Sequence, residues 1–433
     1  MYIPRAAIVG GLAVGHGLKH RDCTPKPSTD PAPAPTTDPA PPAPSPTPAN
    51  TMFSIPSSWQ VPTIDLPYET LRDTAQNAIN QLKSQYWQDP SKLDWGWGTG
   101  TTLGAFVYKD MIASTRDNYD FVKTALESAK ANNANFDPFG YNDDSMWWGT
   151  TAAYAYRAYG DQEFLGYATD VWNWVQNSQV TPEQAAAGKS PVRDAKISSE
   201  CNGHSTAGAV FWRSESSDRT DNGANVITTS LFQTLSVYLA EATNDTKYID
   251  HAKAAYEFIT TVLFRDDPNI PLDGMSLGDC SANNWVFTYN TGKFIESAFG
   301  LSRLTNDDKY RQQALKTIAD AITKVDNWND LATGHIKEGM DGKPEEGNDG
   351  RQFKAIYVRA LTEVARQEFQ NADLHALVSS YININYNSLT KDATDGNGNY
   401  GLKWTGPFDG ANLSPQMNAL DLLNAGIEFN WKR

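Results

Sequence analysis

The chain has 433 residues, of which 40% are hydrophobic and 11% aromatic, enough to bury one large core or two modest ones. Its formal net charge of −15 argues against a nucleic-acid partner, because binding to phosphates depends on clusters of lysine and arginine. A high aromatic content with only 20% charged residues suits a neutral polymer such as a polysaccharide.

The N-terminal region lacks the composition of a folded domain. Within residues 1–22, Arg5 precedes a short, weakly apolar run that is typical of a truncated signal peptide. Residues 23–51 form a Pro/Thr/Ala-rich tract, which we expect to be a disordered linker. The sequence contains neither a membrane-spanning apolar run of about 18 residues nor a hydrophobic C-terminal tail. We therefore expect a secreted, extracellular protein without a membrane anchor, whose folded domain occupies residues 52–433.

From Thr63 onward the chain shows helical periodicity interrupted by short polar turns, without the alternating β-branched runs of strands. A turn pattern recurs at Asp161, Asp245 and Asp307, with a shortened copy at Asp117. In each copy the aspartate can cap the helix that follows. The pattern predicts an all-α array of about a dozen helices in hairpins, which suits an (α/α)6 barrel, a toroid of six inner and six outer helices.

Every second connection between the predicted helices is long and rich in glycine, asparagine, aspartate and aromatic residues. Long loops at one end of a rigid barrel are where binding groups usually lie, so we expect the functional site there. In the first of these loops, glycines flank Trp95 and Trp97, which suits either a sugar-stacking platform or two core anchors. The long connections are residues 88–98, 135–144, 177–225, 265–288 and 326–350.

Two adjacent carboxylates, Asp143 and Asp144, are followed within one helical turn by the adjacent tryptophans Trp147 and Trp148. Carboxyl groups about 5 Å apart can attack an anomeric carbon and protonate the leaving oxygen, and indole rings stack on pyranose rings. A simpler interpretation is that Asn142 or Asp143 caps a helix whose dipole favours acids in its first turn, which leaves the tryptophans unexplained. Both interpretations can hold together, with one tryptophan contacting sugar and the other bracing the helix.

The cysteines and histidines restrict the chemistry only loosely. Cys201 and Cys280 lie in Gly/Ser/Asn-rich sequence, where they either form a disulfide, which leaves Cys23 unpaired, or stay as buried thiols. The six histidines have no zinc-binding spacing, so we expect no metal and no cofactor. Asn244 begins a glycosylation sequon, which would matter in a secreted glycoprotein. We expect a monomer.

Four motifs in order carry a resemblance to a known family. They are Phe139–Gly149 with its Asp-Asp pair, Gly208–Trp212, Trp285–Gly292 and Asp349–Arg359. Together they resemble glycoside hydrolase family 76. The resemblance implies an (α/α)6 barrel with endo-α-1,6-mannanase activity, and the family includes fungal relatives thought to remodel glycans of cell-wall anchors. It also implies a retaining mechanism, with Asp143 as nucleophile and Asp144 as acid/base.

Further residues are predicted to contact the substrate. Trp212 follows a Gly-Ala-Val-Phe motif in which Ala209 replaces the second glycine that is usual in the family. The Trp-x-x-x-Tyr-Asn set that enters a helix at Trp285 places two aromatic residues one turn apart, although Tyr289 would also suit a core. The predicted substrate-binding residues are Trp95, Trp97, Trp147, Trp148, Trp212, Trp285, Tyr289, Asn290 and Gln352.

These observations predict a glycoside hydrolase that cuts α-1,6-linked mannan internally and retains the anomeric configuration, a mannan endo-1,6-α-mannosidase. Its expected partner is therefore a polysaccharide or oligosaccharide, and not nucleic acid. Two alternatives remain open: a transglycosylase of the same family that remodels cell-wall mannosides, and a non-catalytic carbohydrate-binding toroid. The second would keep the aromatic residues without needing both acids.

Overall fold

Six inner helices form a closed ring in the computed structural model, which describes residues 51–338, 341 and 349–430. Each inner helix contacts the next, and the last contacts the first. They are buried on nearly all sides, as expected for helices at the centre of a fold. The inner helices are α2 (Trp97–Ala113), α4 (Asn142–Tyr159), α7 (Val226–Thr243), α9 (Thr288–Thr305), α11 (Phe353–Gln367) and α13 (Leu413–Asn430).

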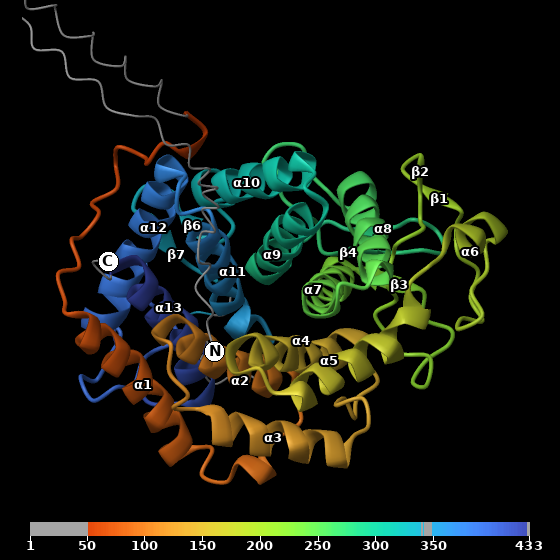
Figure 1. The fold of residues 1–433 in the computed structure, drawn as a ribbon. Helices are drawn as coiled ribbons and strands as arrows, with labels where there is room; N and C mark the ends of the chain where they lie inside the picture. Colours follow the sequence, from red (N-terminus) through yellow and green to blue (C-terminus); the bar gives the residue numbers. More distant parts are fainter. Residues whose placement is uncertain (1–50, 339–340, 342–348, 431–433) are drawn as a thin grey trace, which may run out of the picture. The chain divides into compact units, whose positions relative to one another are not determined.

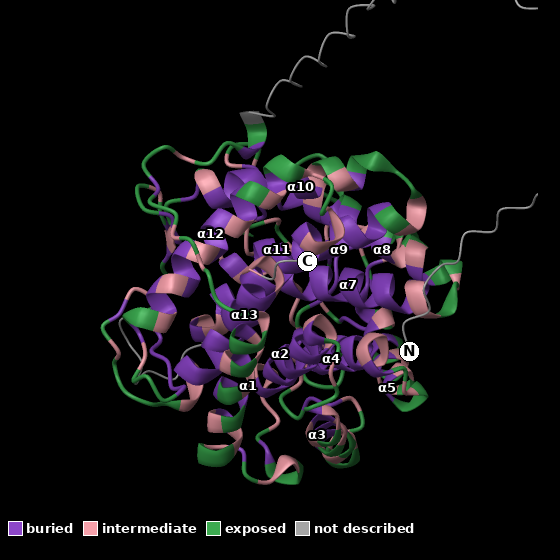
Figure 2. Cartoon of the chain, turned by 60° about the vertical axis from the view of Figure 1, so that its left-hand side comes forward, coloured by how far each residue is buried: buried purple, intermediate pink, exposed green. Residues whose placement is uncertain are grey.

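Six outer helices alternate with the inner ones along the chain and pack around them (Figure 1). Each is buried on its inward face and exposed on the other, as Figure 2 shows. The predicted (α/α)6 barrel is therefore confirmed. The outer helices are α1 (Tyr68–Gln85), α3 (Tyr119–Asn132), α5 (Gln162–Val175), α8 (Thr246–Val262), α10 (Asp308–Thr323) and α12 (Ala372–Lys391).

The predicted turn repeat connects an inner helix to the next outer helix. Asp161, Asp245 and Asp307 each accept a hydrogen bond of 3.0 Å from the backbone N–H two residues further on. The residue before each aspartate has the left-handed conformation that ends a helix. The prediction for the shortened copy was wrong: Asp117 does not cap α3, because its carboxylate pairs with the buried Lys109.

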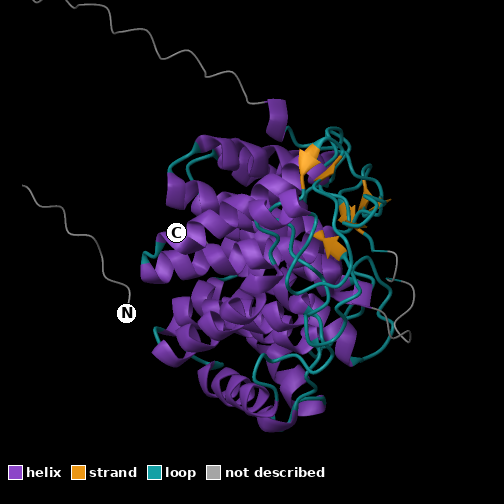
Figure 3. Ribbon diagram, turned by 90° about the vertical axis from the view of Figure 1, so that its right-hand side faces the viewer, coloured by secondary structure: helices purple, strands orange, loops and turns teal. Residues whose placement is uncertain are grey.

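The opposite, outer-to-inner connections contain short antiparallel strands, which lie on one side of the helices in Figure 3. Periodicity did not predict these strands, because each has only two or three residues. They form the pairs β1–β2 and β6–β7 and the three-stranded sheet β3–β4–β5. The strands are β1 (Glu200–Cys201), β2 (His204–Ser205), β3 (Gly223–Asn225), β4 (Gly274–Ser276), β5 (Ala282–Asn283), β6 (Asn329–Asp330) and β7 (His335–Ile336).

Short helical segments complete these connections. The short helix α6 (Pro182–Ala187) lies in the 177–225 loop. The 3-10 turns are η1 (Thr51–Phe53), η2 (Pro90–Lys92), η3 (Gln176–Ser178) and η4 (Asp349–Gln352). The predicted signal-like segment 1–22, and the predicted linker 23–51 except for its last residue, lie outside the described residues, as does Cys23. Among the described residues, no helix is long and apolar enough to span a bilayer.

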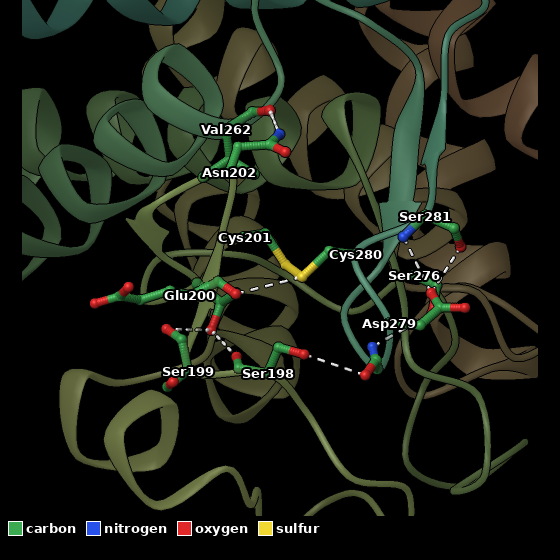
Figure 4. Close-up of a disulfide and its surroundings, with 12 residues drawn as sticks. Ser198, Ser199, Glu200, Cys201, Asn202, Val262, Ser276, Asp279, Cys280 and Ser281 are labelled. Atoms are coloured by element: carbon green, nitrogen blue, oxygen red, sulfur yellow. Dashed lines mark hydrogen bonds between the residues drawn. A yellow bond between two sulfur atoms is a disulfide. The ribbon is translucent and has the colours of Figure 1, made fainter.

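The 177–225 and 265–288 loops are joined to each other. Cys201 and Cys280 form a disulfide, which decides between the two alternatives left open by the sequence (Figure 4). Close by, Ser198 donates a backbone hydrogen bond of 2.6 Å to Leu277 and a side-chain bond of 3.1 Å to Gly278. Together with the pairing of β3 and β4, these links make the two loops one structural unit.

Candidate active site

Asp143 and Asp144 lie in the first turn of α4, at the end of the ring from which the long loops extend. The Asp143 side chain is buried, whereas Asp144 is partly exposed. The free backbone N–H groups at a helix start favour a negative charge nearby. The first turn of this inner helix can therefore hold one ionised carboxylate and present a second one to solvent.

The loop that carries Trp212 clamps the start of α4. The Trp212 Nε1 donates a hydrogen bond of 3.1 Å to Asp143 Oδ2. Asn142, the first residue of the helix, donates its backbone N–H to the Trp212 carbonyl at 2.9 Å and its Nδ2 to the Phe211 carbonyl at 2.8 Å. Asp143 Oδ1 makes no hydrogen bond with any described residue. One oxygen of this carboxylate is thus held, and the other is buried without a hydrogen-bond partner among the described residues.

The environment of Asp143 raises its pKa to about 7. Burial is the largest cause, since an ionised carboxylate loses solvation there. The negative charge of Asp137 raises the pKa further, while the backbone N–H groups of the helix start and the Trp212 indole act in the opposite direction. A carboxyl group with this pKa can hold or release a proton near neutral pH, as acid–base chemistry requires.

A row of aromatic side chains begins one helical turn after Asp143 and reaches the surface. Adjacent ring centroids along it are 3.6 to 6.1 Å apart, and the closest pair, Tyr289 and Phe353, is stacked. The outermost ring, Trp285, is 67% exposed. Such flat apolar faces suit the faces of pyranose rings. In order from the acid pair, this aromatic wall consists of Trp147, Trp97, Phe353, Tyr289, Phe287 and Trp285.

The two adjacent tryptophans of α4 have different surroundings. Trp147 belongs to the aromatic wall and contacts Trp97, with 5.6 Å between centroids. Trp148 is fully buried and stacks on Phe136. It also lies so close to α2 that a Cβ at Gly100 would be 3.1 Å from the indole. Trp148 therefore braces α4 against α2 and offers no surface to a sugar in this structure, while a sugar contact for Trp147 stays a prediction.

The other predicted substrate-binding residues lie at the same end of the barrel. Trp95 is half-buried and packs against the core. Asn290 is buried; its Nδ2 donates to Asp273 at 3.0 Å, and its Oδ1 has no hydrogen-bond partner among the described residues. Gln352 is partly exposed and lies against Gly98 at the start of α2. Substrate contacts for these residues stay predictions.

Buried ion pairs lie within the ring of inner helices. Lys293, on α9, pairs with Glu296 at 2.7 Å, and its Nζ is 5.5 Å from the centroid of the Trp147 ring. Burial lowers the pKa of Lys293. Arg359 makes two hydrogen bonds of 2.8 Å to the Asp421 carboxylate. Because buried charges are stable only when paired, these contacts hold the charged side chains in place, and Lys293 lies against the Trp147 ring of the aromatic wall.

Asp137 and Glu338 were not predicted from the sequence, and Asn142 was expected only as a possible helix cap. Neither Asn142 nor Asp143 caps α4: both lie inside its first turn, and the Asn142 side chain is bonded to the Phe211 carbonyl. Asn142 and Asp137 organise the start of α4 through backbone contacts, and the only sequence signal for Asp137 was the turn-forming Asp-Pro-x-Gly pattern. Glu338 accepts a hydrogen bond from Thr288 at the start of α9. Burial raises the pKa of Glu338 to about 7, which makes it a second group that titrates near neutral pH at this end of the barrel.

Comparison with known proteins agrees with the fold. Residues 194–429, more than half of the 433, match the family model described as Glycosyl hydrolase family 76. The chain belongs to glycosyl hydrolase family 76. The matched segment contains Trp212, Trp285 and Gln352 but begins after the acid pair. The family membership therefore identifies a glycoside hydrolase, and the roles of Asp143 and Asp144 depend on the geometry of the site.

Solved structures share the barrel over most of the chain. An inactive variant of the α-1,6-mannanase GH76A of Salegentibacter sp. HEL1_6, in complex with α-1,6-mannotriose, has a TM-score of 0.67 at 18% identity, covering 82% of this chain and 99% of that chain. Dfg5 from Chaetomium thermophilum, in complex with glucosamine, has a TM-score of 0.66 at 17% identity, covering 85% and 92%. At these identities, the likeness supports the fold.

A curated relative from Schizosaccharomyces pombe is named as a mannan endo-1,6-alpha-mannosidase. It is 23% identical over 244 residues, which cover 54% of this chain and 51% of the relative. The chain thus spans about half the length of the curated relatives that it matches.

Proposed function

We propose that this glycoside hydrolase cuts α-1,6-mannosidic linkages within mannan chains and retains the anomeric configuration. One observation carries the proposal: a buried carboxylate with one unpaired oxygen, Asp143 Oδ1, directly precedes a partly exposed acid, Asp144, beside a wall of aromatic rings. Retaining glycosidases need two carboxyl groups in distinct environments. The exposed outer ring of the aromatic wall, Trp285, could contact sugars away from the acid pair, as internal cleavage of a polymer requires.

In the proposed reaction, Asp143 Oδ1 attacks the anomeric carbon while Asp144 gives its proton to the O6 leaving group. The C1–O6 bond breaks as the C1–Oδ1 bond forms, which leaves a mannosyl ester on Asp143. Asp144, now ionised, takes a proton from an incoming water, whose oxygen attacks C1 and releases Asp143. The Trp212 indole, bonded to Oδ2, stabilises Asp143 as an anion before attack and again as a leaving group.

The raised pKa of Asp143 also fits a second assignment, in which the two acids exchange roles. A buried carboxyl group with a pKa of about 7 would be protonated part of the time at neutral pH, as a general acid must be. The hydrogen bond from Trp212 argues for the first assignment, because this donor stabilises the ionised form. We therefore keep Asp143 as the nucleophile and test the roles directly.

The comparisons support the proposal that α-1,6-mannan is the substrate. The Salegentibacter mannanase variant is called inactive and has two consecutive aspartates replaced by asparagine. Asp143 and Asp144 are likewise consecutive. The S. pombe relatives are named for cleavage of the same linkage. These likenesses favour α-1,6-mannan over other neutral polymers.

The test incubates the protein and its Asp143→Ala and Asp144→Ala variants with linear α-1,6-mannan and follows product size. We expect internal cleavage by the unmodified protein and none by either variant. Adding azide, with an activated mannoside as substrate, separates the roles: the nucleophile variant should give a glycosyl azide of inverted configuration, and the acid/base variant one of retained configuration. Undiminished cleavage by both variants would exclude the acid pair, and no cleavage by the unmodified protein would exclude the proposed activity.

Transglycosylation is a second candidate, favoured by the similarity to Dfg5, whose structure holds an amino sugar. In that reaction a sugar hydroxyl replaces water in the second step, so the first step and its residues stay the same. Adding a labelled mannoside acceptor to the mannan assay distinguishes the two. Transfer gives labelled products longer than the acceptor, whereas hydrolysis gives reducing ends without incorporation of the label.

We also propose that the protein is secreted. The signal-like segment 1–22 and the Cys201–Cys280 disulfide support this, since disulfides persist mainly in oxidising compartments. Expression of the full chain in a secreting host tests it. Recovery of active protein from the medium with the N-terminal segment removed is the expected result, and retention inside the cell would contradict it.

A further inference from the structure

A third aspartate, Asp137, lies in the turn that leads into α4. Its side chain is buried, with 6% exposed. One carboxylate oxygen accepts the backbone N–H of Phe139 at 2.8 Å, and the other accepts those of Gly140 at 2.6 Å and Tyr141 at 2.7 Å. Three backbone donors on one buried carboxylate fix the conformation of residues 137–141.

The same turn is held from its other side by the Trp212 loop. The Gly140 carbonyl accepts hydrogen bonds from the Ser214 backbone at 2.9 Å and from the Ser217 hydroxyl at 2.7 Å. Gly140 has φ +85°, and a Cβ there would lie 2.2 Å from the Ser217 Cβ, so only glycine fits. Tyr141 then pairs with Arg213 as a β-bridge. The turn therefore sets where α4 begins, one residue before Asp143.

Asp137 also acts on Asp143 by its charge. Its carboxylate raises the pKa of the Asp143 carboxyl group, because two negative charges repel. Other charged groups at this end of the barrel come from several elements. They are Asp144 on the same helix, Arg213 in the Trp212 loop with its guanidinium 4.3 Å from the Tyr141 ring, and Lys293 on α9 behind the Trp147 ring.

We propose that Asp137 is a positioning residue for the acid pair: by binding the backbone N–H groups of Phe139, Gly140 and Tyr141, it fixes the start of α4 and places a second negative charge near Asp143. Neither effect requires contact with substrate. The first effect sets the distance from Asp143 to the sugar, and the second sets the pH range in which Asp143 is ionised.

The structure supplies a reporter that needs no substrate. The Trp212 indole N–H is bonded to Asp143 Oδ2, so its NMR shift should follow the ionisation of Asp143. With 15N-labelled tryptophan, the signal is assigned from its loss in Trp212→Phe. In Asp137→Asn we expect the titration midpoint to fall by roughly half a pH unit or more, because a like charge has been removed. An unchanged midpoint would overturn the charge effect.

Asp161 offers a matched control. It also accepts a backbone N–H, from Glu163 at 3.0 Å, and a second bond from Tyr119, but it lies at the other end of α4. Asp161→Asn should lower the melting temperature without moving the Trp212 midpoint. A shift in Asp161→Asn equal to that in Asp137→Asn would mean that the effect is only loss of stability, and would overturn the proposal.

A kinetic assay tests the positioning effect, and it depends on the proposed mannan cleavage. We expect kcat of Asp137→Asn to fall about tenfold or more, since small displacements of catalytic groups are costly. We also expect the acidic limb of its pH profile to move to lower pH. If Asp137→Asn does not fold, Asp137→Glu keeps the charge but displaces the carboxylate, so kcat should fall with an unmoved midpoint. A kcat equal to that of the unmodified protein would overturn the proposal. Failure of the unmodified protein to cleave mannan refutes only the proposed function, since the NMR titration stays decisive for Asp137.

Discussion

Replacing Trp212 with phenylalanine should shift the pH profile of the enzyme while keeping an aromatic face for sugar. The substitution removes the Nε1–H that donates to Asp143 Oδ2 at 3.1 Å. Trp212 is 38% exposed, and its ring lies beside Tyr141 rather than within the core. We therefore expect little change in folding, and the loss of one charge-assisted hydrogen bond.

The size of the effect follows from that one bond. A hydrogen bond to a charged group contributes about 1.5 to 3 kcal/mol, and 1.36 kcal/mol corresponds to one pH unit. The pKa of Asp143, about 7 in the unmodified protein, should therefore rise by about 1 to 2. At pH 7, the ionised fraction would fall from about one half to between about 1% and 9%. If Asp143 is the nucleophile, kcat/KM at pH 7 falls roughly 5- to 50-fold, and the acidic limb moves upward.

The assay measures kcat/KM on α-1,6-mannan between pH 4 and pH 9 for the unmodified protein, Trp212→Phe and a control, Trp174→Phe. Trp174 is also exposed, at 44%, but lies on the outer helix α5. The control should have the profile of the unmodified protein. An upward shift of the basic limb, in place of the acidic one, would assign Asp143 as the general acid. A profile that does not move at all would refute the argument that Trp212 stabilises the Asp143 carboxylate.

Three further predictions concern the surroundings of the site. Cys201→Ser, which opens a loop with a sequence separation of 79, should lower the free energy of unfolding by up to about 4.5 kcal/mol, measured by denaturant titration without reductant; equal stability would mean that the other loop contacts suffice. Trp285→Ala should lower kcat/KM on long mannan more than on short oligosaccharides, whereas Phe369→Ala, at a residue 60% exposed and outside the aromatic wall, should change neither. The folded-state pKa of Glu338 is raised to about 7, so its ionisation lowers stability as pH rises from about 4.5 to 7. In Glu338→Gln the melting temperature should therefore depend less on pH over that range. A melting temperature that falls as steeply with pH as in the unmodified protein would show that Glu338 is not the group responsible.

The fold was predictable because local chemistry specifies its turns. Asp161, Asp245 and Asp307 cap their helices with the next residues of the chain, so the sequence alone contains both partners of each bond. The prediction that Asp117 caps α3 was wrong for the opposite reason. Its partner Lys109 belongs to the preceding helix and is buried, and no local pattern showed that a buried charge would need this carboxylate.

The candidate site was only partly predictable. Adjacent acids and adjacent tryptophans identified α4, but the different surroundings of Trp147 and Trp148 arise from the packing of α4 against α2. The bonds from Trp212 and Asn142 join segments that are 69 residues apart in the chain. The sequence could not show whether Cys201 and Cys280 form a disulfide for the same reason, since only the folded chain brings them together.

The chemical difference between Asp143 and Asp144 is therefore tertiary in origin, since the two neighbours share the same helix start. Asp143 is buried, accepts the Trp212 indole N–H and is repelled by the charge of Asp137, and these two partners lie in the 177–225 loop and in the turn before α4. The disulfide and the β3–β4 pairing hold that loop to the next one, which carries Trp285. The charge state of the acid pair and the outer end of the aromatic wall thus depend on one structural unit. Opening the disulfide should accordingly move the acidic limb of the pH profile as well as lower stability, and a pH profile that is unchanged in Cys201→Ser would show that Trp212 is held by the α4 contacts alone.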